Sequence, residues 1–454
     1  MSSGSPSGSP DYPDRSLSLT PRSVIDASKP AVAVVDPCST GAALAKDLAA
    51  RGRPVICVWS DMCPEQLRAH TGNSAVQYAG VIAHNGDINK TAAAVRALGL
   101  PLGDVIVGCE TGVLCADELA EALGVRGNGT AQSDLRRNKF NQTEAVRAAG
   151  LNAMHQVLAS STADVERFLE QHQPTPFSAV VKPVDGAGSQ GVYICNSADE
   201  VRAAFAELQG TTNCLGLECR EVLLQEYLKG HEYVVDTVSR DGVHKCTAIW
   251  MYDKRTFNGK PTVYFGMHLL AVEDEPHLAA MVRYTFGVLN AIGIRNGAVH
   301  AEVKAEARGP VLIEANCRLH GLDGLWIPIA RAASGHDQVS ALVDSYLEPA
   351  RFEELPREPR ALSAAGVAAT VRSAVEGTIS RVVDERIAQL RALPSFCDLY
   401  LAAELVVGAP VVKTVDVLTE CGNVNLWHSE PAQLRRDYEA ACAIIDQGLY
   451  EVAA

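Results

Sequence analysis

Two carboxylates and an amide lie close together in residues 300–318, HAEVKAEARGPVLIEANCR. Val and Ile alternate with other residues, which predicts two short strands, and the Gly-Pro pair predicts a turn at residues 307–310. Glu302 and Glu314 lie equally far from that turn, so a hairpin would bring them together. With Asn316 they supply the oxygen ligands that Mg²⁺ prefers. A charged surface hairpin is the alternative interpretation.

The side chains of a strand alternate between its two faces, which predicts which groups share a side of this hairpin. The expected sets are His300, Glu302 and Lys304 on the first strand, and Leu312, Glu314 and Asn316 on the second. Arg318 follows two residues later. Its planar guanidinium could reach phosphate or carboxylate oxygens.

A glycine-rich loop, DGAGSQG at residues 185–191, joins two predicted strands within residues 178–195. Its glycines would let the backbone approach a ligand and point N–H groups at phosphate oxygens. No GK[ST] follows, so this is not a Walker loop. Lys182 precedes the loop at a strand end, where its ammonium could reach the same phosphates. A plain turn and a solvated lysine are the alternatives.

The stretch QEYLKGHE adds a predicted strand end, Gln225-Glu226-Tyr227-Leu228, whose backbone could pair with the edge of an adenine ring. Glu232 follows and could accept hydrogen bonds from ribose hydroxyls. An ordinary exposed turn with two carboxylates is the alternative.

Composition narrows the class of protein. The chain has 454 residues, of which 47% are hydrophobic and 21% charged, as in an ordinary globular protein. A formal net charge of -14 argues against nucleic acid or an anionic membrane as the main partner. The sequence has neither a signal-peptide pattern nor an apolar run of the ~18 residues that span a membrane. Thirteen cysteines without CxxC pairs predict reduced thiols in a cytoplasmic protein.

The order of predicted elements indicates an α/β fold. Apolar strands at residues 31–36, 54–60 and 104–110 alternate with helices, which predicts an open parallel sheet. GxGxxG spacing is missing, so a dinucleotide site there is not expected. Residues 350–361, with two prolines among many charges, are interpreted as a linker.

Five segments are therefore expected. They are a flexible Ser-, Pro- and Gly-rich tail (1–29), an N-terminal α/β domain (30–135), a lid-side subdomain with the glycine loop (136–228), a metal-binding subdomain (229–349) and a small C-terminal α+β module (350–454).

Taken together, this succession of motifs resembles the ATP-grasp superfamily. The motifs, in chain order, are a helical Lys139, Lys182, the loop at 186–191, Gln225 to Leu228 with Glu232, then Glu302, Glu314, Asn316 and Arg318. The resemblance implies an ATP pocket between two α+β subdomains. Two positions depart from the usual pattern, because Asn138 stands where many relatives have Asp and Cys317 where many have Pro.

The resemblance also implies a role for each matching residue. Phosphates would be contacted by Lys139, Lys182, Gly188, Ser189, Gln190 and Gly191. Adenine would be lined by Gln225, Glu226, Tyr227 and Leu228, and the ribose held by Glu232. Magnesium, with Mn²⁺ as an alternative ion, would be bound by Glu302, Glu314 and Asn316. Arg318 and Lys182 would be catalytic, and Arg318, His320, His268 and Asp323 would surround the substrate.

Within the superfamily the chain is most similar to the L-amino acid ligases, on the segments ADELAEALG, EANCRLHG and LDGL. This implies an ATP-dependent carboxylate–amine ligase that joins amino-acid-like substrates through an acyl phosphate. A homodimer is a common state in the superfamily. The alternatives are a biotin-carboxylase-like enzyme and a non-catalytic ATP-binding module.

Overall fold

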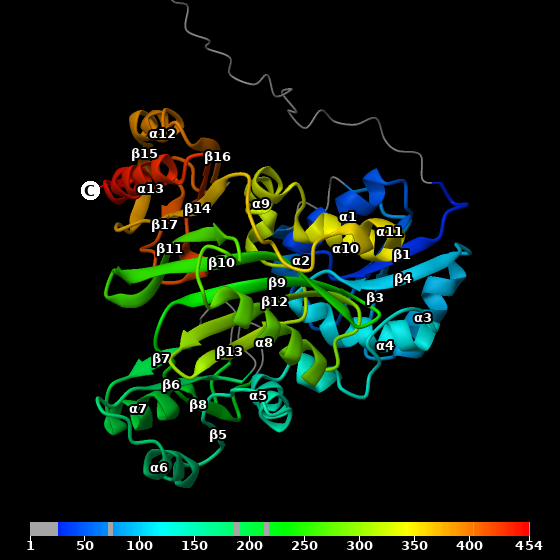
Figure 1. Ribbon diagram of the computed structural model, residues 1–454, viewed down its shortest axis with the longest axis horizontal. Helices are drawn as coiled ribbons and strands as arrows, with labels where there is room; N and C mark the ends of the chain where they lie inside the picture. The colour runs from blue at the N-terminus through cyan, green and yellow to red at the C-terminus, as the bar shows by residue number, and fades with distance from the viewer. Residues whose placement is uncertain (1–25, 71–75, 185–190, 213–217, 403, 454) are drawn as a thin grey trace, which may run out of the picture.

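The structure is a computed structural model that describes residues 26–70, 76–184, 191–212, 218–402 and 404–453. An eight-stranded sheet runs through the middle of these residues, with smaller sheets at three of its sides (Figure 1). The twelve cysteines in this part of the chain are free thiols. None of its helices is both long and apolar enough to cross a membrane.

The N-terminal sheet is built from short apolar strands that are all parallel, in the order β3-β2-β1-β4. Helices cover the sheet, so the middle strands are buried and their sequences are almost purely Ala, Val and Ile. The elements are β1 (Ala31–Val35), α1 (Thr40–Ala50), β2 (Val55–Trp59), α2 (Glu65–His70), β3 (Gly80–Ala83), α3 (Ile88–Ala97), β4 (Leu102–Val107) and α4 (Val113–Leu123). The predicted open parallel sheet is confirmed, and β3 is a further edge strand that its short sequence did not reveal.

A second, antiparallel sheet has the order β5-β8-β6-β7. Two helices pack on one face of it through a core that includes Phe168 and Phe205. The elements are β5 (Gln156–Ala159), α6 (Thr162–Gln171), β6 (Ala179–Pro183), β7 (Tyr193–Cys195), α7 (Ala198–Leu208) and β8 (Val222–Glu226). This sheet lies below the central sheet in Figure 1, and the chain passes from one to the other between β8 and β9.

The central sheet has the order β13-β12-β9-β10-β11-β14-β18-β16. Its strands are β9 (Glu232–Arg240), β10 (Val243–Phe257), β11 (Lys260–Leu270), β12 (Gly297–Glu306), β13 (Gly309–Asn316), β14 (Ala365–Val371), β16 (Phe396–Leu401) and β18 (Gly422–His428). On one face Val235 and Val299 pack against α8 (Leu278–Ala291). On the other, Val234 and Trp250 join a core with α9 (Ile327–Ser334) and α10 (Gln338–Leu347). Strand alternation thus gives each face its own core.

The C-terminal segment extends the central sheet, because β14 pairs with β11 and β18 pairs with β14. The remaining elements are α11 (Pro349–Glu354), β15 (Gly377–Val382), α12 (Asp384–Arg391), β17 (Pro410–Val411), α13 (Pro431–Asp446) and β19 (Tyr450–Val452). The linker predicted at residues 350–361 is wrong in its first half. Pro349 starts α11, as proline can at a first helical turn, and Phe352 is buried in the core beneath it.

Candidate functional site

The hairpin of β12 and β13 forms as the sequence predicted. Glu302 pairs directly with Glu314, and His300 pairs with Asn316. Directly paired residues of an antiparallel ladder have Cβ atoms about 4.5–5.5 Å apart, so the two glutamates share one small region. The hairpin therefore brings two carboxylates that are twelve residues apart in the sequence opposite each other.

One expectation for this hairpin is wrong. The register shifts after Glu302, so that Val303 pairs with Leu312 and Ile313 is the extra residue of a bulge. Leu312 consequently packs with Val303 in the core under α8 and does not share the face of Glu314. Ile313 lines the cavity beside Glu314 instead. A single inserted residue reverses the alternation on which the prediction rested.

Glu314 is held between cations and an amide. The Nζ of Lys139 lies 3.2 Å from its Oε2, and the Nδ2 of Asn316 donates to its Oε1 at 3.2 Å. Lys139 opens α5 (Lys139–Ala148), which Asn138 caps by accepting the N–H of Asn141. Burial alone would raise the pKa of Glu314, but Lys139 and Lys182 outweigh it and lower that pKa to about 2. The carboxylate is therefore ionised and available to a cation.

Lys182 faces Glu314 from β6 of the second sheet. Its side chain is almost fully buried, and burial lowers its pKa to about 8 although the charge of Glu314 opposes the shift. An anion nearby favours the charged form of a buried ammonium. Lys139 and Lys182 thus form a cationic pair suited to phosphate oxygens.

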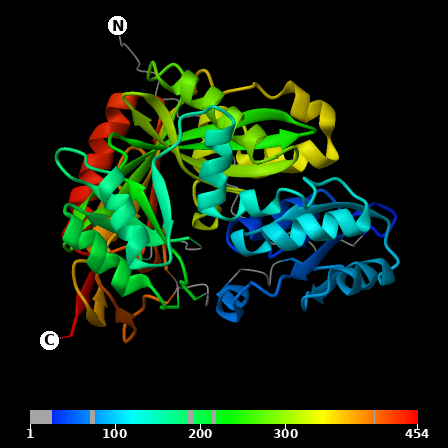
Figure 2. The same cartoon turned by 90° about the horizontal axis from the view of Figure 1, so that it is seen from below.

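Both lysines line a cavity of about 590 Å³ between the second sheet and the central sheet. Figure 2 shows these two parts of the molecule facing each other. Both apolar and charged side chains line it. The lining includes Met154, Val180, Ile194, Leu228, Met251 and Ile313 at apolar positions and Lys139, Lys182, Glu232, Lys254, Glu302, Lys304 and Glu314 at charged ones.

The expected adenine segment borders the cavity. Residues 225–228 are all in its lining, and Leu228 packs with Met154 and Val311 in a small apolar cluster. The side chain of Gln225 donates to Gln156 at 2.9 Å, so it is fixed within the sheet. The carboxylate of Glu226 pairs with Arg308 from the hairpin turn. Apolar side chains beside the end of a strand would suit a flat base.

Glu232 is one of the charged residues that line the cavity. Its Oε1 is 2.5 Å from the Nζ of Lys254, and its Oε2 is 3.7 Å from the Nζ of Lys304. The three side chains form one ion-paired group in the cavity wall. A ribose contact for Glu232 stays a prediction.

Most of the glycine loop, including Gly188, Ser189 and Gln190, lies outside the described residues. Gly191 is described and has a φ of +70°. A Cβ there would lie 3.1–3.2 Å from Pro183 and Leu208, so only glycine fits without displacement. The phosphate-binding role of the loop stays a prediction.

Arg318 is anchored by a residue that the sequence reasoning missed. Its Nε donates to Oε2 of Glu110 at 3.1 Å, while Arg137 donates to the other oxygen at 3.0 Å. Glu110 follows β4 at the carboxyl end of a parallel strand, where such sheets commonly place functional groups. Its position after a predicted strand was the signal by which sequence reasoning could have found Glu110. The N-terminal domain thus sets the orientation of Arg318.

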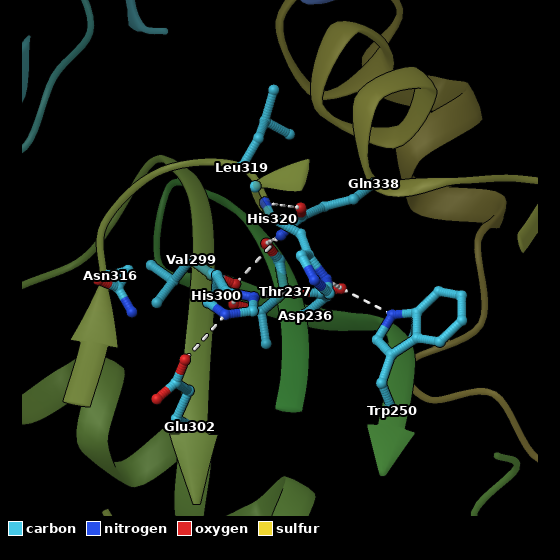
Figure 3. A network of polar contacts seen from close by, with 12 residues as sticks. Asp236, Thr237, Trp250, Val299, His300, Glu302, Asn316, Leu319, His320 and Gln338 are labelled. Carbon is cyan, nitrogen blue, oxygen red and sulfur yellow. Dashed lines mark hydrogen bonds and ion pairs between the residues drawn. The ribbon is translucent and has the colours of Figure 1, made fainter. Parts of the chain in front are cut away.

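His320 lies behind the cavity, in a buried network around Asp236 (Figure 3). The carboxylate of Asp236 accepts hydrogen bonds from Nδ1 of His300 at 3.1 Å and from Nδ1 of His320 at 2.8 Å. Trp250 donates to it from Nε1 at 2.9 Å. Sequence reasoning also missed Asp236, although one acid in the apolar strand EYVVDTV signals a buried group that needs partners.

Charges in this network follow from burial and pairing. Burial would raise the pKa of Asp236, but its two histidines hold that pKa below the usual range. Burial also opposes the charge of His300, yet its bonds to Asp236 and Glu302 raise its pKa. Burial dominates at His320 and lowers its pKa to about 4. The three side chains have metal-ligating types, and the 2.8 and 3.1 Å distances join the histidine nitrogens to the carboxylate oxygens as direct hydrogen bonds.

The other two residues expected near the substrate differ in place. His268 lines the cavity, with its ring 4.6 Å from that of Tyr438, and burial lowers its pKa. Asp323 is not part of the lining; its N–H donates to Ser39 at 3.1 Å. Its φ of 51° is left-handed, which is uncommon outside glycine. The loop carrying Asp323 thus docks on the start of α1.

The donor set of the hairpin fits a divalent cation. Glu302 and Glu314 face each other, both line the cavity, and the amide of Asn316 touches Glu314. Hard carboxylate and amide oxygens beside a cavity are the environment in which Mg²⁺ is commonly held. The assignment of individual ligands stays a prediction.

Comparisons with known proteins show which protein family and which solved structures this chain resembles. The ATP-grasp domain family model matches residues 175–324, which include β6, β7 and β8 of the second sheet and the β12–β13 hairpin. The solved L-amino acid ligase from Bacillus licheniformis superimposes with a TM-score of 0.71 at 18% identity, over 94% of this chain and all of that one. The chain therefore carries an ATP-grasp domain, and the resemblance inferred from its motifs is confirmed.

Curated relatives narrow the class further. Dapdiamide A synthase of Enterobacter agglomerans is 29% identical over 422 residues, covering 91% of this chain and 96% of that enzyme. Human carnosine synthase 1 is 29% identical over 250 residues, covering 50% of this chain and 29% of its own length. The predicted class, an ATP-grasp ligase that forms carbon–nitrogen bonds, is confirmed at this level.

Proposed function

We propose that this protein uses ATP to join the carboxylate of one amino-acid-like substrate to the amine of another. The observation that carries the proposal is the cavity in which Lys139 and Lys182 of one side face the paired glutamates of the β12–β13 hairpin. Cations for phosphates and oxygens for a metal lie across from each other. The full-length similarity to dapdiamide A synthase supports a ligase of this kind.

In the proposed reaction, an oxygen of the substrate carboxylate attacks the γ-phosphorus of ATP and ADP leaves. The amine nitrogen then attacks the acyl carbon, phosphate departs, and the nitrogen loses a proton. Phosphoryl transfer depends on positioning and charge neutralisation more than on a nucleophilic side chain. Lys139 and Lys182 would neutralise the phosphate oxygens.

Arg318 would bind the substrate carboxylate and stabilise the acyl centre as it becomes tetrahedral. Its anchoring to Glu110 limits the positions that its guanidinium can adopt. Glu302, Glu314 and Asn316 would hold magnesium, which when bound withdraws charge from the phosphate oxygens. His268 would face the substrate from the cavity wall.

A panel of amino acids with ATP and magnesium tests the proposal. We expect phosphate release only with particular pairs of amino acids, and a product whose mass is the sum of the pair minus water. Biotin with bicarbonate serves as the comparison substrate, since a carboxylase would respond to it. Phosphate release that depends on biotin, with no amide product across the panel, would overturn the ligase proposal.

A further inference from the structure

Two hydrogen bonds to one oxygen hold the carboxylate of Asp236 in place. Asp236 lies on β9 and is completely buried. Its Oδ2 accepts from both His320 and Trp250, which leaves Oδ1 for His300. A carboxylate with one oxygen fixed by two donors has little freedom to rotate. Oδ1 therefore presents a fixed acceptor to the ring of His300.

His300 passes this constraint to the proposed metal side. With Nδ1 bound to Asp236, the other ring nitrogen faces Glu302, and Nε2 lies 3.4 Å from Oε1 of that carboxylate (Figure 3). The hydroxyl of Tyr252 lies 3.5 Å from the same nitrogen. The two residues alternate on the same face of β12, two positions apart. The side chain of His300 is almost fully buried, which limits the access of water to both contacts.

A glutamate in a cavity wall has several rotamers and would lose their entropy when it binds an ion. A hydrogen bond from a rigid neighbour reduces that loss and aims one oxygen before the ion arrives. Glu314 has such partners in Lys139 and Asn316. Among the described residues, His300 is the ion-pair partner of Glu302.

We propose that Asp236 and His300 are positioning residues that hold Glu302 in the orientation in which it binds the metal. The proposal rests on the proposed function, because it takes Glu302 as a metal ligand. It names a line of contacts, from the core under α10 through Asp236 and His300 to the cavity, which neither the family match nor the relatives assign.

Two substitutions of His300 separate its contact with Asp236 from its contact with Glu302. Asparagine places an amide nitrogen where Nδ1 stands, so His300→Asn can keep Asp236 and loses Glu302. Glutamine reaches the place of Nε2, so His300→Gln can keep Glu302. The measurement is Mn²⁺ binding to the ADP-bound protein by electron paramagnetic resonance, with the melting temperature of each variant recorded beside it.

We expect His300→Asn to weaken Mn²⁺ binding by about tenfold or more, and His300→Gln to weaken it less. His244 supplies the matched control. It is a buried histidine of the same sheet, bonded to Ser239 at 2.8 Å and to Asn290 at 3.1 Å, and it is not in the cavity lining. His244→Asn should lower the melting temperature and leave Mn²⁺ affinity unchanged.

Glu302→Gln distinguishes the ways in which the idea could fail. If Glu302→Gln weakens Mn²⁺ binding but His300→Asn does not, the positioning role is wrong and the metal site stands. If Mn²⁺ affinity falls equally in His300→Asn and His244→Asn, the loss is a general effect of a damaged fold and the positioning role is again wrong. If Glu302→Gln itself has no effect, the proposed metal site has failed and this inference with it.

Discussion

Charged side chains in the cavity form ion pairs with each other, and these ion pairs would have to be replaced when the proposed ligands bind. Glu314 holds Lys139 at 3.2 Å, although each is proposed to serve a different ligand, the metal and the phosphates. Nucleotide and metal entering together would replace this ion pair with two new ones. The ion pair therefore keeps both side chains close to the positions in which the proposed ligands need them.

Glu314→Gln tests this exchange. The substitution keeps size and hydrogen bonding but removes the charge, and losing one such interaction typically costs a few kcal/mol in the transition state. We expect turnover to fall by roughly 10²-fold or more, with only partial rescue by excess magnesium. Steady-state kinetics across magnesium concentrations measure this.

Glu306→Gln is the control on the same hairpin, because Glu306 is not in the cavity lining and should be replaceable without loss. A surface glutamate at position 314 would instead leave activity within about a factor of two and stability within ~0.5 kcal/mol. That result would remove the metal site from this hairpin.

At the scale of elements, the bulge in β13 decides which side chains meet the cavity. Leu312 is 1% exposed and packs under α8, whereas Ile313 lines the cavity. The bulge thus inserts a cavity residue without removing a core residue. It is also placed immediately beside the Glu302–Glu314 pair.

Alanine substitutions at these two neighbours should separate stability from nucleotide binding. Leu312→Ala should lower the free energy of unfolding by about 2–5 kcal/mol, as for a buried leucine, with little change in the KM for ATP. Ile313→Ala should lower the free energy of unfolding by less and should raise the KM for ATP. The nucleotide would lose apolar contacts with the cavity lining. Urea unfolding and kinetics on both variants make the comparison. Regular alternation without the bulge would give the reverse pattern.

At the scale of the whole molecule, the C-terminal segment completes the central sheet. Met267 and Leu269 of β11 pair with Ala368 and Gly366 of β14. Beyond β14, a core that includes Leu426 and residues of α13 covers the same sheet. Residues 362–402 and 404–453 are therefore structurally continuous with the strands that carry the site, whatever boundary is drawn between them.

A chain ending at residue 361 should fail to fold stably. It would expose the edge of β11 and the apolar side chains that α13 covers, which favours aggregation. Solubility, circular dichroism and melting of the truncated chain measure the effect. Removal of residues 1–25, a stretch rich in Ser, Pro and Gly, is the comparison and should leave melting and activity nearly unchanged. A soluble, cooperatively melting chain of residues 1–361 would show that the C-terminal segment is an independent module.

Local sequence was sufficient for much of this protein. Apolar runs of five or six residues predicted the parallel strands, because strands covered on both faces must be apolar throughout. The equal spacing of Glu302 and Glu314 about Arg308 predicted that they meet in one hairpin, although their direct pairing also depends on the bulge at Ile313. The order of motifs along the chain was enough to indicate the ATP-grasp domain that the comparisons confirm.

Tertiary structure alone decided which distant groups meet. Arg318 and Glu110 are 208 residues apart in the chain, and Asp236 joins His300 and His320 from 64 and 84 residues away. Such contacts depend on how separate sheets close on one another, which spacing within one strand does not encode. The bulge at Ile313 is decided in the same way, because core packing and not alternation places Leu312. Sequence determined the parts of the site, and long-range packing determined their partners.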